Sequence, residues 1–168
     1  MPARSTSLPS TSADAWSETL AGSFAQIERE YGNLQRSWLS GRRTLLIAAL
    51  LDSFADRAFS DLLRRNDLRL AGIEDTLAYR RHLSAACPAL GTIFDLCSMG
   101  EESPRLVTHA VKVPITHYPD LAVEDFMVSL YNHNSVERVL FAWPDGREVL
   151  AIDLLGEAIG WWRANWPG

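Results

Sequence analysis

The feature that most constrains this chain is a row of large apolar residues spaced three or four positions apart near its N-terminal end. Its members are Trp16, Leu20, Phe24, Ile27, Tyr31, Leu34 and Trp38. This spacing puts the side chains on one face of an α-helix and is close to that of a coiled-coil seam. We therefore expect a long first helix that begins near Ser12 or Asp14. Its apolar face should pack on other helices of the same chain, and the alternative is a seam between two copies.

A second helix is expected over about 42–65, because Ser40 can cap its start. Its apolar surface is broader than that of the first helix, which indicates a central position. At the edge of its polar face, Asp52 and Asp56 lie four residues apart, and paired acids can hold a metal or share a proton. Arginines and a further acid follow on the same helix, so we favour a salt-bridged, solvated face over a catalytic pair.

Two shorter helices are expected next, over about 73–86 and from Pro88 to about residue 96. The break falls at Cys87 because a residue that precedes proline resists helical backbone angles, whereas proline is favoured at the first position of a helix. The inward positions of the third helix are predicted to be Ile73, Leu77, Leu83 and, beside them, Tyr79. The first hundred residues thus predict a bundle of about four helices.

The remaining residues have the pattern of a small sheet with helices. Residues 105–113 alternate like a strand, and the apolar spacing over 123–130 favours a helix. Two strand-like runs flank the PDG sequence at 144–146, which is typical of a tight turn. Asp153 can cap a last helix over 154–166. We predict an α+β fold in which an N-terminal helical bundle packs on a small antiparallel sheet with βαββα order.

Length and composition indicate how the chain is divided. With 168 residues it fits a single domain with a sizeable hydrophobic core. Residues 1–11 are rich in Ser, Thr and Pro and predict a disordered tail. Residues 12–168 are expected to form one α+β domain from a helical part (12–100) and a βαββα part (101–168), because three strands are too few to be stable alone.

The charge distribution argues against nucleic-acid binding. The net charge is −5, and the acidic excess lies wholly in residues 101–168, whereas binding to phosphates requires a basic face. Three arginine pairs, at 42–43, 64–65 and 80–81, could form a basic stripe, and three helices followed by a hairpin have the element order of a winged helix. Acidic residues match these arginines in number, so we expect no nucleic-acid partner.

Cysteine content and hydropathy predict a cytoplasmic protein. Cys87 and Cys97 are too few for a disulfide framework, so reduced thiols are expected. No signal-peptide pattern is present, and the longest apolar run, at 45–51, is too short to span a bilayer. Fifteen of the sixteen basic residues are Arg, which indicates the high-GC coding of a bacterium. Common motifs for phosphate, dinucleotide or zinc binding are missing, so we expect no cofactor and no membrane association.

Three of the four histidines, His109, His117 and His133, fall within one short span and are the candidate catalytic residues. Imidazole titrates near neutral pH and can serve as a base or a metal ligand. Compact zinc sites need ligands two to five residues apart, which these are not, so we expect no metal. With Tyr118, they would line a pocket between bundle and sheet. The simpler interpretation makes His109 a half-buried histidine with a satisfied hydrogen bond.

The last helix carries three of the six tryptophans, in the sequence GWWRANWPG. Its inward row is predicted to be Leu155, Ile159, Trp162 and Trp166. Trp161 points about 100° away from Trp162, as successive helical residues do. Either the helix lies between sheet and bundle with two apolar sides, or Trp161 belongs to an exposed patch that a partner covers. We favour the first, and keep Trp161, Trp16 and Trp38 as candidate partner-binding residues.

These patterns favour a non-enzymatic accessory, adaptor or regulatory protein that binds another protein, and a homodimer is a further expectation. The support is the lack of a catalytic motif, the seam-like first helix, the surplus of aromatic residues and the acidic second half. A small enzyme or ligand-binding protein with the histidine-lined pocket is the alternative. A nucleic-acid-binding regulator comes third.

A single core predicts that residues 101–168 do not fold alone. Expressed by themselves, they should show no cooperative thermal transition by circular dichroism, because most of the apolar surface that their helices must cover lies in residues 12–100. A sharp transition of the isolated segment would instead show two separate cores.

Overall fold

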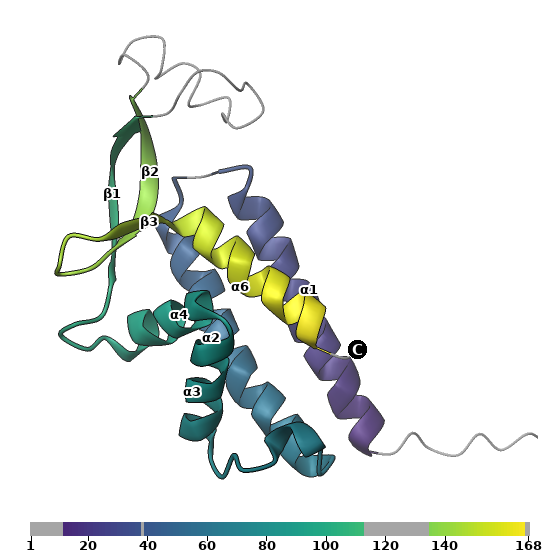
Figure 1. The fold of residues 1–168 in the computed structure, drawn as a ribbon. Helices are drawn as coiled ribbons and strands as arrows, with labels where there is room; N and C mark the ends of the chain where they lie inside the picture. The colour runs from purple at the N-terminus through teal and green to yellow at the C-terminus, as the bar shows by residue number, and fades with distance from the viewer. Residues whose placement is uncertain (1–11, 38, 113–134, 167–168) are drawn as a thin grey trace, which may run out of the picture.

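The computed structural model describes residues 12–37, 39–112 and 135–166, and these form an α+β fold (Figure 1). Its helical elements before the sheet are α1 (Ser12–Leu34), α2 (Gly41–Arg64), the 3-10 helix η1 (Leu68–Leu70), α3 (Thr76–Ala86) and α4 (Pro88–Ser98). The later elements are β1 (Arg105–Lys112), β2 (Ser135–Ala142), β3 (Glu148–Leu150) and α6 (Ala151–Asn165). The predicted helical bundle followed by a small antiparallel sheet is confirmed. The helix predicted over 123–130 lies outside the described residues.

Helix α2 occupies the centre of the fold, as its broad apolar surface predicts. It contacts α1, α3, α4, α6 and β1 (Figure 1). Side chains along its length are fully enclosed; they include Ile47, Ala48, Leu51, Phe54, Ala55 and Ala58. Ser40 caps its start, since its hydroxyl accepts a hydrogen bond from the Arg43 backbone N–H at 3.2 Å. Not every apolar residue is covered, however, because Leu46 is 45% exposed.

The apolar face of α1 packs within its own chain. Leu20, Ile27 and Leu34 are buried, and Phe24 and Tyr31 pack beside them against α2 and α6. The helix ends at Leu34, before the last residue of the predicted row. Trp38 and the side chain of Trp16 lie outside the described residues. The middle of the seam-like row is therefore a bundle face of one chain.

Two helix starts differ from the sequence prediction, and each has a local cause. Helix α3 begins at Thr76 because the Asp75 carboxylate caps it, accepting a hydrogen bond from the Ala78 N–H at 2.6 Å. This start places Tyr79 on the buried face and leaves Leu77 63% exposed, so the inward position predicted for Leu77 is wrong. The prediction that Asp153 caps the last helix is also wrong. Helix α6 begins at Ala151, and Asp153 lies in its first turn, where its charge favours the helix dipole.

The sheet has the order β1-β2-β3, with antiparallel pairing throughout. The β2–β3 turn contains the predicted PDG sequence, and Gly146 adopts φ +86°, a conformation that other residues rarely take. The Trp143 N–H donates to the Arg147 carbonyl at 2.9 Å and closes the turn. Helix α6 follows β3 directly and contacts β2, β3, α1, α2 and α4. It thus lies between the sheet and the bundle, the arrangement that its two apolar sides favour.

The buried residues form one cluster that draws side chains from α1, α2, α3, α4, β2 and α6. Its aromatic centre is Phe54 of α2, whose ring lies 5.5 Å from that of Phe24 and 4.9 Å from that of Trp162. The Phe54 and Trp162 rings meet edge to face, the geometry that aromatic quadrupoles favour. None of the helices in the described part of the chain is long and apolar enough to cross a membrane.

A polar contact joins α3 to α2. Arg80 Nη1 lies 2.6 Å from Asp52 Oδ1, and Nε and Nη2 each lie 2.9 Å from one oxygen of Asp56. The guanidinium also lies 5.0 Å from the centre of the Phe94 ring on α4. Hydrogen bonds to Asp56 and Asp52 hold the pKa of Arg80 above its usual range. The two carboxylates are therefore salt-bridged, as expected, but their partner comes from α3 rather than from α2 itself.

Removing this three-helix contact should destabilise the protein. Arg80→Met leaves two carboxylates close together without a cation, and the half-buried setting predicts a loss of about 1–3 kcal/mol in the free energy of unfolding. Urea unfolding measures the loss. The control is Arg81→Met, at an exposed neighbour for which the described residues show no ion pair. Equal stability of the two variants would contradict a structural role for Arg80.

The contact between α1 and α6 requires a glycine at position 156. The Tyr31 hydroxyl donates to the Ile152 carbonyl at 3.1 Å, and a Cβ atom at Gly156 would overlap that hydroxyl. Burial raises the pKa of Tyr31, so the phenol stays protonated at neutral pH and can donate this hydrogen bond.

Two glycines of α6 make a matched pair for testing this packing. Gly156→Ala should lower the free energy of unfolding by about 1–3 kcal/mol, because Tyr31 must move from its hydrogen bond. Gly160→Ala on the same helix meets nothing within 4 Å and should raise it by up to about 1 kcal/mol through helix propensity. Thermal and urea unfolding of both variants test this, and a stabilising Gly156→Ala would refute the close approach.

Candidate functional site

A pocket of about 360 Å³ opens between α6, α3 and η1. We call it the aromatic pocket, and its lining residues are Leu62, Arg69, Tyr79, His82, Leu83, Trp161, Trp162, Asn165 and Trp166. Concave sites of this size, with mostly apolar walls and a few polar groups, are typical of binding sites in proteins. Trp161, the residue whose covering the sequence left open, is one of its walls.

The three tryptophans form the α6 side of the pocket. Trp162 is 1% exposed, and its indole N–H has no hydrogen-bond partner in the described part of the chain. Trp161 and Trp166 lie with their ring centres 5.1 Å and 6.0 Å from that of Trp162, both near edge-to-face. Trp161 is half-buried, because consecutive helical positions cannot both point into the core. Its ring packs partly on its own core and partly lines the pocket.

Helix α3 supplies the opposite wall. Tyr79 and His82 are three residues apart and therefore share a helix face. The Tyr79 ring is buried 5.5 Å from that of Phe59, and this burial raises the pKa of Tyr79 to about 12. The phenol is thus neutral at physiological pH. The capped start at Asp75 and the Arg80 contact with α2 together set where this wall lies.

The third wall is η1, which carries Arg69. The Asp67 carboxylate accepts hydrogen bonds from Arg69 Nε at 2.9 Å and Nη2 at 2.7 Å, and it also caps the backbone N–H of Arg69 at 2.9 Å. These hydrogen bonds hold the pKa of the half-buried Asp67 well below its usual range. The guanidinium is therefore held in one place beside the pocket.

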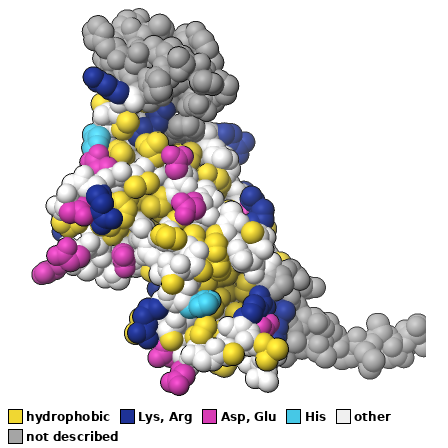
Figure 2. All heavy atoms as spheres, in the orientation of Figure 1, with side chains coloured by type: hydrophobic (Ala, Val, Ile, Leu, Met, Phe, Trp, Pro, Cys, Tyr) yellow, Lys and Arg dark blue, Asp and Glu magenta, His cyan; other side chains and the backbone are white. Residues whose placement is uncertain are grey.

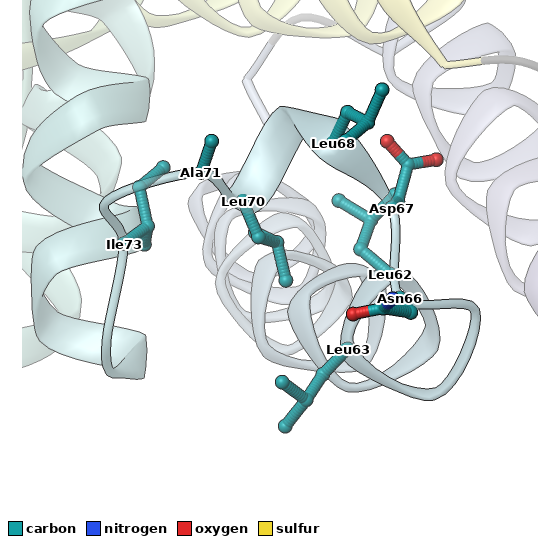
Figure 3. Close-up of a pocket in the computed structure, with 8 residues that line it drawn as sticks. All are labelled: Leu62, Leu63, Asn66, Asp67, Leu68, Leu70, Ala71 and Ile73. Atoms are coloured by element: carbon teal, nitrogen blue, oxygen red, sulfur yellow. The ribbon is translucent and has the colours of Figure 1, made fainter.

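A second pocket, of about 240 Å³, shares the lining residue Leu62 with the aromatic pocket. Figure 3 shows the residues that line this second pocket. We call it the leucine pocket; its other lining residues are Leu63, Asn66, Asp67, Leu68, Leu70, Ala71 and Ile73. Leu63 and Leu68 lie on opposite sides of the chain reversal in Figure 3 and are 60% and 89% exposed. Such exposed leucines around two adjoining hollows are characteristic of interaction surfaces.

Figure 2 also shows hydrophobic side chains at the surface. On the lower half of this face, hydrophobic side chains run down the middle, and Lys or Arg side chains lie on either side of them. Asp61 is buried, with ion pairs of 2.6 Å to Arg64 and 2.8 Å to Arg65. These ion pairs within α2 neutralise part of the positive charge near the pockets.

The histidine site predicted from the sequence is only partly visible. His109 lies on β1 with its side chain 42% exposed, and its Nε2 is 2.9 Å from Glu148 Oε2 of β3. His117, Tyr118 and His133 lie outside the described residues, so the predicted cluster stays a prediction. Among the described residues, no group of three His, Cys, Asp or Glu side chains is placed to hold a metal ion.

The other candidate groups are occupied by structural contacts. In each arginine pair at least one member has an acidic partner, namely Glu30 for Arg43, Asp61 for the pair 64–65, and two aspartates for Arg80. Cys97 lies in the last turn of α4, and burial and the nearby Asp52 raise the pKa of its thiol to about 11. A protonated thiol is a poor nucleophile. Both cysteines are free.

Sequence reasoning found Trp161 but not the residues opposite it. The i,i+3 spacing of Tyr79 and His82 on a helix is a usable signal, because it places both side chains on one face. Arg69 carried no such signal, because its position depends on how the chain turns after α2. No family model, no curated protein and no solved structure matches the chain. The function is therefore inferred from the chemistry of the pockets themselves.

Proposed function

We propose that this is a non-enzymatic accessory or adaptor protein of the cytoplasm that binds another protein through the aromatic pocket. The observation that carries the proposal is the position of Trp161. Its ring is half-buried at the wall of a pocket with three other aromatic side chains, where the chain's own packing leaves apolar surface in contact with solvent. Tryptophan and tyrosine dominate the energetic centres of protein–protein interfaces.

The surroundings of the pocket support a protein partner over a reaction. Burial keeps Tyr79 protonated, and Arg69 is paired with Asp67, so these groups are suited to binding rather than proton transfer. The exposed Leu63 and Leu68 extend the apolar surface beyond the pocket. A homodimer could not form through Leu20, Ile27 and Leu34 of the α1 row, because these residues are buried within one chain.

The proposal predicts a partner whose binding depends on Trp161. Tagged full-length protein, recovered from its native host at physiological salt, should carry a stoichiometric protein. Trp161→Ala should weaken that complex by roughly 30-fold or more, since a central interface tryptophan contributes about 2 kcal/mol or more. Isothermal titration with the purified partner measures the change.

Two further variants separate binding from folding. Asn165→Arg places bulk at the pocket mouth on an exposed residue and should also weaken the complex. Trp143→Ala removes a half-buried tryptophan of the β2–β3 turn, outside the pocket, and should leave binding unchanged. Circular dichroism confirms that all three variants fold. The proposal fails if no stoichiometric partner is recovered, or if Trp161→Ala and Trp143→Ala bind it equally.

A further inference from the structure

The lining of the aromatic pocket has a one-sided electrostatic character. Its ionisable side chains are Arg69, His82 and Tyr79, and no Asp or Glu is among the lining residues. Because burial keeps the Tyr79 phenol protonated, no side chain that lines the aromatic pocket is negatively charged at neutral pH, whereas the Asp67 carboxylate that pairs with Arg69 lies in the adjoining leucine pocket. Aromatic rings attract cations, but Arg69 opposes a second cation in the same pocket. The lining therefore favours an apolar group with an acidic neighbour.

Arg69 is prepared to bind an anion. Its Nε and Nη2 atoms engage Asp67, and its Nη1 atom has no partner in the described part of the chain. A guanidinium has five N–H donors, so several remain for a ligand. Asp67 both caps η1 and pairs with the side chain, so little further conformational entropy is lost when Arg69 binds.

The two adjoining pockets indicate that the ligand is a segment of a larger molecule. The leucine pocket and the aromatic pocket meet at Leu62, and η1 contributes Leu68 and Leu70 to one and Arg69 to the other. A peptide with two large apolar side chains can fill both, as helices and extended segments do in hydrophobic grooves. Nucleic acid fits less well, because Asp61 pairs with Arg64 and Arg65 and interrupts the row of basic groups that a phosphate backbone needs.

We infer that the partner binds through an acidic, apolar peptide segment, in which a large apolar side chain enters the aromatic pocket and a neighbouring carboxylate pairs with Arg69. A second apolar side chain of the same segment occupies the leucine pocket. This inference rests on the proposed function and specifies the chemistry of the partner.

Synthetic peptides test this chemistry before any partner is known. The probes are labelled twelve-residue peptides with two Phe or Leu residues three or four positions apart, flanked by Glu, Ser or Lys in three matched sets. Fluorescence polarisation with the full-length protein measures their affinities. The Glu set should bind about tenfold more tightly than the Ser set, and the Lys set least tightly, as expected for a partly exposed charge pair.

A charge reversal at Arg69, with a matched control, tests whether this residue causes the preference for the Glu peptides. Arg69→Glu should invert the order, so that the Lys set binds best. The control is Arg147→Glu in the β2–β3 turn, where Arg147 pairs with Asp145 through the same two-residue spacing. Both variants lose an Asp-x-Arg pair in a turn, but only Arg69 lines the pocket. An unchanged order in Arg69→Glu, or equal binding of the three sets, overturns the inference.

Other outcomes distinguish this inference from the proposed function. Binding of all three sets that is equal in affinity and lost in Trp161→Ala overturns the acidic chemistry and leaves the pocket as the protein-binding site. Binding of the Glu set that survives in Trp161→Ala overturns both. Displacement of the Glu peptide by an equal concentration of phenylacetate, or of a twelve-nucleotide single-stranded RNA, overturns the inference in favour of a small carboxylate or a nucleic acid.

Discussion

Burial of the broad apolar face of α2 is the constraint on which the other elements depend. Enclosing its apolar residues requires α1, α3, α4 and α6 around one 24-residue helix. Phe54 lies at the centre of this packing, because its ring contacts Phe24 of α1 and the C-terminal Trp162 and Trp166. The positions of the C-terminal tryptophans follow from that contact, because Trp162 must lie against Phe54 to exclude water. The hydrophobic effect thus places α6 against α2, although the two helices are far apart in the sequence.

The aromatic pocket is a consequence of how the helices diverge at the end of α2. Trp162 is drawn into the core, and its neighbour Trp161 is left at the margin by helical geometry. Trp166 follows the end of α6 in an extended conformation and is also half-buried. Tyr79 of α3 is buried on the other side, and η1 closes the third. Apolar rings on several elements surround a space that none of them fills. Natural cores are close-packed, so a gap of this size beside exposed leucines is consistent with a binding surface.

Arginine has a consistent role in this chain, which is to position elements through short ion pairs. Arg80 joins α3 to α2 through two aspartates. Arg69 and Arg147 each close an Asp-x-Arg turn. Because most of these guanidinium groups have carboxylate partners within the chain, the arginine pairs visible in the sequence do not form an unpaired basic stripe. Arg69 keeps donors beyond the Nε and Nη2 atoms that engage Asp67, because a guanidinium has five N–H groups.

Local patterns in the sequence were sufficient to predict most of the described helices, the PDG hairpin and the order of the described elements. Apolar spacing, Ser40 as a cap and Pro88 as a helix start act over a few residues, and neighbouring residues alone decide them. The start of α3 was misplaced because Asp75 caps the helix at Thr76, and that of α6 because the helix follows β3 directly, without a side-chain cap at Leu150.

The candidate site was less predictable, because it depends on contacts between residues far apart in the chain. The sequence determined by itself that Trp161 could not share the buried row of Trp162, since helical geometry separates adjacent side chains. Only the tertiary structure decided what faces Trp161, because Tyr79, His82 and Arg69 reach it through the packing of α3 and η1 around α2. The physical reason is that apolar burial is not directional, so the identity of a residue's distant neighbours is set by the whole core.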